Sequence, residues 1–110
     1  MGAYASGNWL IKQGKEAEFI QKWRNWLEWS RDHAPGLKSA KLLRSADDPR
    51  RFVSMSRWES EQARSDWKTS DEFKKMFADV RALADEFVGG DYNKEVAIKN
   101  ESMAGMSGTA

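Results

Sequence analysis

The sequence predicts an α+β fold, in which a four-stranded antiparallel sheet carries its helices on one face. Three observations lead to this prediction. Short strand-like runs alternate with runs of helical periodicity, and two neighbouring strand-like runs are joined by a tight turn. The chain has 110 residues, which is the length of one domain. We therefore expect a single domain over 1–98 and a flexible tail of small and polar residues over 99–110.

The first strand is predicted over 3–11, where Trp9 and Ile11 stand among small residues and a turn signal at Gly14 follows. Neither face of this run carries a charge, which is typical of a strand that is covered on both sides. A helix is predicted over 15–33, and Pro35 with Gly36 ends it. Its apolar residues at helical spacing are Phe19, Ile20, Trp23, Trp26 and Leu27.

The next predicted strands, over 37–45 and 51–58, form a hairpin through the turn residues 46–50. Ser60 is expected to cap a short helix over 60–66. Thr69 and Glu72 have the spacing of a capping box, so a longer helix is predicted to start there and to end before Gly89 and Gly90. A last strand is predicted over 92–98. The apolar stripe of the long helix consists of Phe73, Met76, Phe77, Val80, Leu83, Ala84 and Phe87.

This order of elements is the ferredoxin-like split βαβ arrangement, in which the helices pack on one face of the sheet. The other face then lacks a cover within the chain. If the strands are apolar on both sides, a second copy of the chain is the economical way to bury that face. We therefore predict a homodimer.

The composition excludes several classes of function. The chain has no cysteine, which rules out disulfides, thiolate metal sites and cysteine nucleophiles. The net charge of +1 lacks the basic field of a general nucleic-acid or membrane-surface binder. A single histidine, His33, cannot build a His-rich metal site, and no glycine-rich phosphate loop is present. Without a visible signal peptide or membrane-spanning run, a cytoplasmic protein is expected.

Six tryptophans in so short a chain indicate an aromatic core or an aromatic pocket. Two positions stand out as candidate ligand contacts. Asn8 is an amide among apolar neighbours on a strand, and a buried amide needs partners. Trp67 lies outside the stripe of the long helix and is suited to form a pocket wall. Trp29 falls at the edge of the first helix's stripe, so we expect it to be half-buried. An aromatic pocket with an amide suits a flat, apolar, oxygen-bearing ligand.

Five runs of residues form a recognisable set. They are Asn8-Trp9-Leu10, Gly14-Lys15-Glu16-Ala17-Glu18-Phe19, Pro35-Gly36, Phe52 to Trp58 and, as the most specific run, the segment from Trp58 to Phe73. Together they resemble the antibiotic biosynthesis monooxygenase (ABM) domain family, over about residues 4 to 98. The resemblance implies the dimeric α+β barrel, in which two ferredoxin-like sheets close on each other.

The family has branches with different chemistry. One branch consists of oxygenases that convert anthrone-type polyphenols to quinones with molecular oxygen and no prosthetic group. A second branch degrades haem, and uses an asparagine on the first strand, a tryptophan before the last helix and an iron-binding histidine ten residues later. Asn8 and Trp67 match the first two positions, but Phe77 stands at the third, so haem degradation is disfavoured.

The resemblance therefore favours a monooxygenase that oxidises an aromatic or quinol-like small molecule with molecular oxygen and without a cofactor. A non-catalytic dimer that binds a small molecule is the alternative, since fold does not fix function. Asn8 and Trp67 are the expected catalytic residues, with Asn8 donating to a substrate oxygen and Trp67 stacking on its ring. The base stays open among Asp66, His33 and a water held by Asn8. The other expected substrate-binding residues are Phe73, Phe77, Trp29 and His33.

Overall fold

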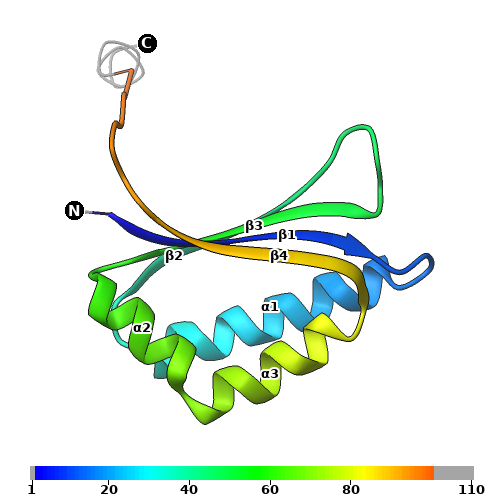
Figure 1. Ribbon diagram of the computed structural model, residues 1–110, viewed down its shortest axis with the longest axis horizontal. Helices are drawn as coiled ribbons and strands as arrows, with labels where there is room; N and C mark the ends of the chain where they lie inside the picture. Colours follow the sequence, from blue (N-terminus) through cyan, green and yellow to red (C-terminus); the bar gives the residue numbers. More distant parts are fainter. Residues whose placement is uncertain (1, 101–110) are drawn as a thin grey trace, which may run out of the picture.

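The computed structural model describes residues 2–100, so most of the predicted tail lies outside the described residues. Figure 1 shows the arrangement of the strands and helices. In chain order the elements are β1 (Ala3–Ile11), α1 (Glu16–His33), β2 (Leu37–Arg44), β3 (Arg51–Trp58), α2 (Glu61–Thr69), α3 (Asp71–Arg81) and β4 (Ala84–Asn93). Within residues 2–100, no helix has both the length and the apolar composition that crossing a bilayer requires.

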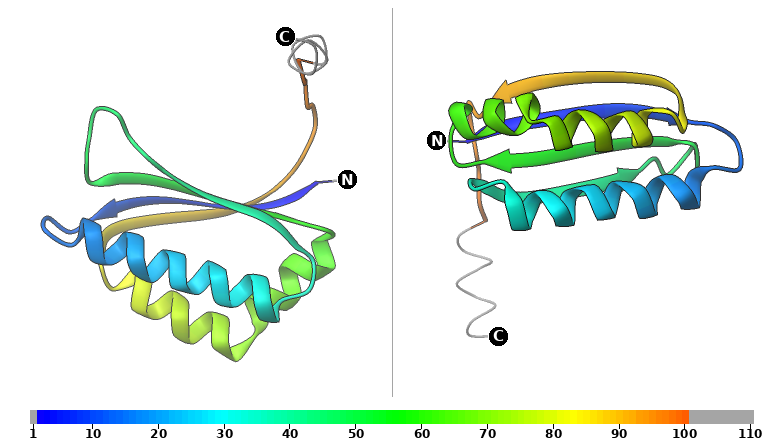
Figure 2. Two further views of the ribbon diagram at one scale, coloured as in Figure 1. Left: turned by 180° about the vertical axis from the view of Figure 1, so that it is seen from behind. Right: turned by 90° about the horizontal axis from the view of Figure 1, so that it is seen from below.

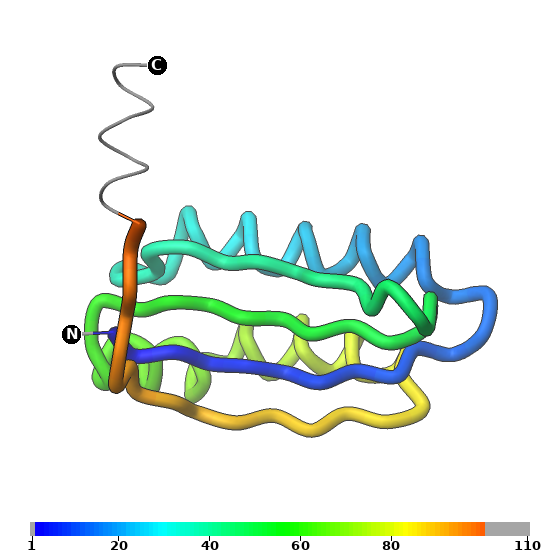
Figure 3. The backbone as a smooth tube through the Cα atoms, turned by 90° about the horizontal axis from the view of Figure 1, so that it is seen from above, coloured from blue at the N-terminus to red at the C-terminus, as the bar shows by residue number. Residues whose placement is uncertain are grey.

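The strands form one antiparallel sheet in the order β2-β3-β1-β4, and the helices lie together on one of its faces (Figures 1 and 2). The predicted fold class is thus confirmed. Seen from above, the other face is open, and the chain after β4 leaves the sheet on that side (Figure 3). Within the described chain β1 is covered on one face only, and Asn8 is exposed on the open face. The expectation that a second copy covers this face stays a prediction.

The core lies between the sheet and the helices, because every second strand residue faces the helices. Trp9, at the centre of β1, is 1% exposed, and its ring packs 5.1 Å from Phe19 of α1 and 4.3 Å from Phe87 of β4. Phe19 in turn lies 4.9 Å from Phe52 of β3. These ring contacts join α1 to three strands and make the aromatic residues the main body of the core.

The first helix agrees with its predicted stripe. Trp23 and Trp26 are buried on the face toward the sheet, and Trp29 is half-buried at the edge of that face. The helix ends at His33, and the chain turns back into β2 through Gly36, whose φ of 98° lies in the left-handed region that favours glycine. A Pro-Gly pair at this point thus has a direct structural reason.

The segment after β3 contains two helices, capped by Ser60 and Ser70. The hydroxyl of Ser60 accepts from the backbone N–H of Ala63, as the sequence predicts. The cap of α3 is Ser70, which accepts from the N–H of Phe73. The predicted capping box at Thr69 is therefore wrong. The Thr69 hydroxyl instead donates back to the preceding turn of α2, where it closes that helix.

The prediction of one long helix that includes Phe87 is also wrong. Helix α3 ends at Arg81, and β4 begins at Ala84. Phe87 keeps the helical spacing of the stripe although it lies on β4. The chain folds back after α3, and the Phe87 ring points into the core that the α3 stripe also faces. The second edge of β1 needs a partner along its whole length, and β4 supplies it.

The predicted last strand over 92–98 is displaced for the same reason. β4 ends at Asn93, and the chain beyond it has no regular structure up to residue 100. Val96 and Ile98 are 76% and 90% exposed. Gly89 and Gly90, which were expected to end a helix, lie inside the strand, where an added Cβ on either would meet a neighbouring aromatic ring.

Candidate functional site

A cavity of about 320 Å³, which we call the aromatic pocket, lies between the sheet and the helices. Its size is that of a small-molecule site. Small residues of the sheet form its floor, and rings from the helices and β4 form its walls. The floor consists of Ala5, Gly7, Ser54, Ser56 and Gly89, and the aromatic walls of Trp23, Trp26, Trp67, Phe73, Phe77 and Phe87.

The floor of the aromatic pocket depends on two paired glycines. Gly7 of β1 stands opposite Gly89 of β4 and opposite Ser54 of β3. A Cβ on Gly7 would lie 2.7 Å from Nε1 of Trp9 and 2.8 Å from Oγ of Ser54. No side chain fits there, so the floor stays at the height of the backbone. The alternation of small residues from Ala3 to Gly7 was the sequence signal for this feature.

Trp67 forms a wall of the pocket from within α2, so it does not precede the last helix as a free residue. Its ring is 5% exposed and lies 5.5 Å from Trp26, nearly parallel to it, and 4.6 Å from Trp58. Its indole N–H donates to Oγ of Ser30 at 2.8 Å. Trp67 therefore offers the pocket its aromatic surface, while its N–H is already used.

Phe73 and Phe77 of α3 continue the wall. Their rings lie 5.6 Å apart and are parallel, and Phe77 also packs 5.1 Å from Phe87. Among the described residues that line the pocket, none offers an imidazole, thiolate or phenolate to an iron ion. The residues present therefore do not fit a haem group. No set of three potential ligands among the described His, Asp and Glu residues is placed to hold a metal ion.

The polar groups of the pocket are few. Ser54 and Ser56 present hydroxyls on the floor, and Lys68 lies on the lining with its ammonium against the Asp91 carboxylate. Nε1 of Trp26 is buried and has no hydrogen-bond partner among the described residues. Lys68 is the one charged side chain of the described lining, so the pocket is apolar with a single cation at its wall.

Asn8 does not belong to this pocket. It follows Gly7 on β1, so its side chain leaves the opposite face of the sheet, where it is exposed beside Val53 and Val88. The sheet separates Asn8 from Trp67, and the structure does not bring the two expected catalytic residues together. The sequence could not decide this, because neither face of β1 carries a charge.

Trp29 and His33 lie at the end of α1, in a separate groove against α2. Their rings stack at 4.8 Å, and Nδ1 of His33 lies 3.0 Å from the carbonyl oxygen of Trp29. Asp66 borders the same groove. Trp67 separates this groove from the aromatic pocket, since it lines both. Neither candidate base, His33 or Asp66, therefore faces the ligand space that Trp67 walls.

An exposed ion pair lies near the end of α1. The hydrogen bond from Arg31, at 3.0 Å, lowers the pKa of the Asp32 carboxyl. Both side chains are more than half exposed, so the pair is screened by solvent.

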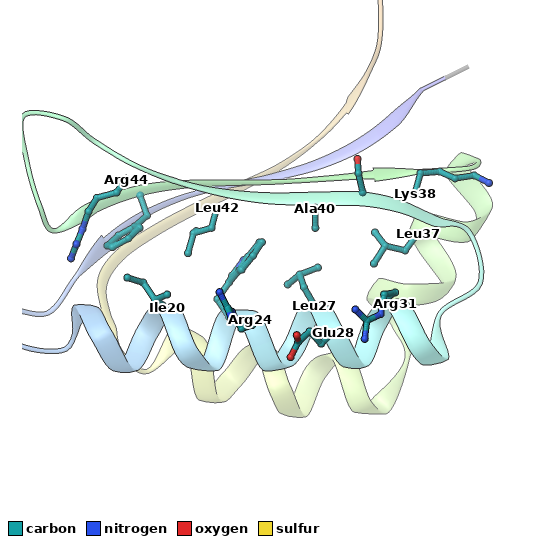
Figure 4. A pocket seen from close by; sticks show the side chains of 13 residues that line it. Ile20, Arg24, Leu27, Glu28, Arg31, Leu37, Lys38, Ala40, Leu42 and Arg44 are labelled. Atoms are coloured by element: carbon teal, nitrogen blue, oxygen red, sulfur yellow. The ribbon is translucent and has the colours of Figure 1, made fainter.

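A larger cavity of about 520 Å³ lies between α1 and the edge strand β2 (Figure 4). Its floor is apolar, and three of the four basic side chains of its lining, all but Arg24, are already engaged. Lys38 lies 3.8 Å from Glu59, Arg31 pairs with Asp32, and Nε of Arg44 donates to the Pro49 carbonyl. We take the smaller aromatic pocket as the candidate site. Aromatic rings form its walls, and its lining carries hydrogen-bonding groups that no described residue uses.

Two buried groups escaped the sequence analysis. The hydroxyls of Ser54 and Ser56 face the pocket, although serine on a strand is usually exposed. Arg64 of α2 is 8% exposed, and its Nη1 donates at 3.0 Å to the carbonyl oxygens of Tyr4 and Tyr92. Arg64 thereby ties β1 to β4 beneath α2 and is not itself among the residues that line the pocket.

The fold and the pocket can now be compared with known proteins. The antibiotic biosynthesis monooxygenase (ABM) family matches residues 4–79. The chain belongs to this family. The match includes β1, both walls from α1 and α2, and all but the end of α3, so it covers most of the aromatic pocket. No curated protein sequence matches the chain.

Solved structures share the ABM fold of this chain. SnoaB, a cofactor-independent oxygenase from Streptomyces nogalater, superposes with a TM-score of 0.80 and 18% identity, over 88% of this chain and 96% of SnoaB. A putative antibiotic biosynthesis monooxygenase from Nitrosomonas europaea gives a TM-score of 0.74 and 23% identity, over 84% of this chain and 89% of that chain.

A conserved protein from Methanosarcina mazei Go1 is similar as well. Its TM-score is 0.77 and its identity 19%, over 86% of this chain and 94% of that chain. At these identities the similarity establishes the shared ABM fold, and the activity of this chain has to be argued from its own pocket.

Proposed function

We propose that this ABM protein is an oxygenase that oxidises an aromatic, oxygen-bearing small molecule with molecular oxygen in the aromatic pocket. The observation that carries the proposal is the pocket itself, an apolar cavity of about 320 Å³ with aromatic walls and a single cation. The similarity in fold to a cofactor-independent oxygenase supports the same reaction class.

The substrate supplies the electrons in this reaction. A CH₂ group flanked by aromatic rings reacts with O₂ to give a carbonyl group and one molecule of water, so atoms and electrons balance without a cofactor. The reactive form is the anion left when the substrate loses a proton. The lining adds little charge to stabilise that anion, because the ammonium of Lys68, the one cation of the described lining, is paired with the Asp91 carboxylate. The apolar walls exclude bulk water.

The test of this proposal is oxygen uptake by the purified protein over a panel of anthrones and hydroquinones, with no metal or cofactor added. We expect saturable uptake above the spontaneous rate. Trp67→Phe removes part of the pocket wall and should lower kcat/KM by about tenfold, equivalent to about 1.4 kcal/mol. Trp29→Phe is the matched control, since the Trp29 ring lies in the groove beyond Trp67 and not in the pocket.

Equal loss in the Trp67→Phe and Trp29→Phe variants would contradict the assignment of the pocket. Uptake that never exceeds the spontaneous rate, together with saturable ligand binding, would favour the second candidate, a non-catalytic binding protein. One observation favours that candidate: no carboxylate or imidazole is found among the described residues that line the pocket, so no base of the chain faces the ligand.

We also propose that the open face of the sheet is a homodimer interface. Large apolar side chains gather on it, with Leu43 58%, Met55 42% and Val88 67% exposed. They lie on three of the strands and face the same side of the sheet. Cross-strand pairing links Leu43 to Val53, Val53 to Asn8 and Asn8 to Val88, and residues paired in this way point to the same face. A second copy of this face is apolar in the same way and would cover it. A solution mass of one chain at micromolar concentration would refute this.

A further inference from the structure

Three buried indole groups of this protein donate to serine hydroxyls. An indole N–H that is buried without an acceptor costs about 1–3 kcal/mol, so each pairing has a structural reason. The distances from Nε1 to Oγ are nearly equal. The pairs are Trp67 to Ser30 at 2.8 Å, Trp9 to Ser54 at 2.9 Å and Trp58 to Ser56 at 2.9 Å.

The three serines differ in what their own protons do. The hydroxyl of Ser30 donates to the carbonyl oxygen of Trp26 at 2.8 Å, so both of its hydrogen-bonding roles are filled inside the protein. The hydroxyls of Ser54 and Ser56 accept an indole N–H, but no described residue accepts a hydrogen bond from either of them. Each therefore keeps one unused donor, although Ser54 is 9% and Ser56 5% exposed.

Both unused donors are on the floor of the aromatic pocket, and Ser30 is not. Ser54 and Ser56 stand two residues apart on β3, so they face the same side at a spacing of about 7 Å. Their neighbours across the strand pair are Gly7 and Ala5, which are too small to cover the hydroxyls. The two donors therefore remain accessible from the pocket while their strand positions are fixed.

We propose that the Ser54 and Ser56 hydroxyls form a two-donor floor that selects a flat aromatic ligand with acceptor oxygens at both ends, such as a quinone or the matching phenolate. The inference deepens the proposed function and rests on it, because it names the substrate class of the same pocket. The ligand ring lies over Gly7 and between the aromatic walls, and one oxygen approaches each hydroxyl.

The indole partners make these hydroxyls better donors. A hydroxyl that already accepts a hydrogen bond is polarised, so its own proton is donated more strongly. Negative charge on a ligand oxygen strengthens such a bond further. The described lining holds no carboxylate that would compete for either proton. The floor thus discriminates by acceptor oxygens, whereas the walls accept any flat apolar body.

The test compares two ligands of similar shape, 1,4-naphthoquinone and naphthalene, by equilibrium dialysis against the full chain. The quinone has two acceptor oxygens and naphthalene none. The absence of cysteine removes the thiols that would react with the quinone. We expect the quinone to bind at least tenfold more tightly, and the preference to fall by about five- to tenfold in Ser54→Ala and in Ser56→Ala, as for the loss of one net hydrogen bond.

Ser30→Ala is the matched control, because it also leaves an indole N–H without its acceptor but removes no donor from the pocket. Damage to the fold lowers the affinity for both ligands together, so the ratio of affinities reports the donors alone. Should an alanine variant fold poorly, Ser54→Thr and Ser56→Thr keep a hydroxyl donor on the strand and introduce no thiol. The quinone preference is expected to persist in them, and its loss would contradict the role of the hydroxyls.

Equal affinities for the two ligands in the wild-type protein would overturn the inference, and so would a preference that survives in both serine variants. Binding of neither ligand overturns it too. The outcome is separate from that of the oxygen-uptake test: a quinone preference that depends on the serines, found without any uptake, supports the two-donor floor and contradicts the oxygenase.

Discussion

On every strand of this sheet, neighbouring residues belong to two different surfaces. Gly7 and Trp9 of β1 face the helices, where the Trp9 ring is 1% exposed, whereas Asn8 between them is exposed on the open side. The backbone and its hydrogen bonds are common to both faces. The difference therefore lies in what covers them: the helices complete one face with an aromatic layer, and nothing in the described chain completes the other.

This comparison separates two kinds of apolar residue. Apolar residues on the helix side are buried by contacts within the chain, and the aromatic pocket lies where the sheet residues beneath the helices are small. Those on the open side, such as Met55 and Val88, gain it only from a second surface. Stability and ligand binding should thus depend on the helix side, and assembly on the open side.

The largest effect is expected from Trp9→Ala. Trp9 contacts rings of α1, α3 and β4 and donates to Ser54, so its truncation leaves a large cavity and should cost about 3–5 kcal/mol of unfolding free energy. Asn8→Ala, one position away on the exposed side, should stay within about 0.5 kcal/mol. Urea unfolding at one fixed protein concentration measures both, and comparable losses would erase the distinction between the faces.

The next effect concerns assembly. Val88→Lys places a charge on the proposed dimer interface, once from each copy, and should weaken the dimer by about a hundredfold because the ammonium groups are desolvated there. Asp79→Lys, on the exposed side of α3, adds the same side chain away from the sheet and should leave the dimer intact. Sedimentation equilibrium gives both constants. Dimers of equal strength would move the interface elsewhere.

The sequence predicted the first two thirds of the fold well, because there the chemical signals are local. Pro35 and Gly36 end α1, Ser60 caps α2, and β3 has its predicted bounds, 51–58. The last third failed because Phe87 continues a helical spacing while lying on a strand. Only the unpaired edge of β1, a feature of the whole sheet, decides for a strand there.

The site was harder to predict than the fold. Trp67 was singled out because it left the helical stripe, and the structure places it in the pocket wall. Asn8 was singled out for being polar, but the side on which a strand residue lies follows from the packing of the helices and not from its own chemistry. Ser54 and Ser56 gave no signal, because their role depends on hydrogen bonds from indole groups. Trp9, the partner of Ser54, is far from it in the sequence, and nothing in the sequence shows that Trp58 turns its indole N–H toward Ser56.

The smallest effects come from adding single methyl groups to the pocket floor. A Cβ at Gly7 would lie within 3 Å of Trp9 and Ser54, which hold each other by a hydrogen bond and cannot both move away. Gly7→Ala should therefore cost about 1–3 kcal/mol. At Gly89 the nearest atom is the far end of the Phe87 ring, 2.8 Å away, and a small rotation of that ring relieves the contact. Gly89→Ala should thus cost less than Gly7→Ala, and both should weaken naphthoquinone binding, since either methyl group narrows the floor. If Gly7→Ala were the milder change, the Trp9–Ser54 pair would be movable, and the pocket floor would adapt to its ligand instead of selecting it.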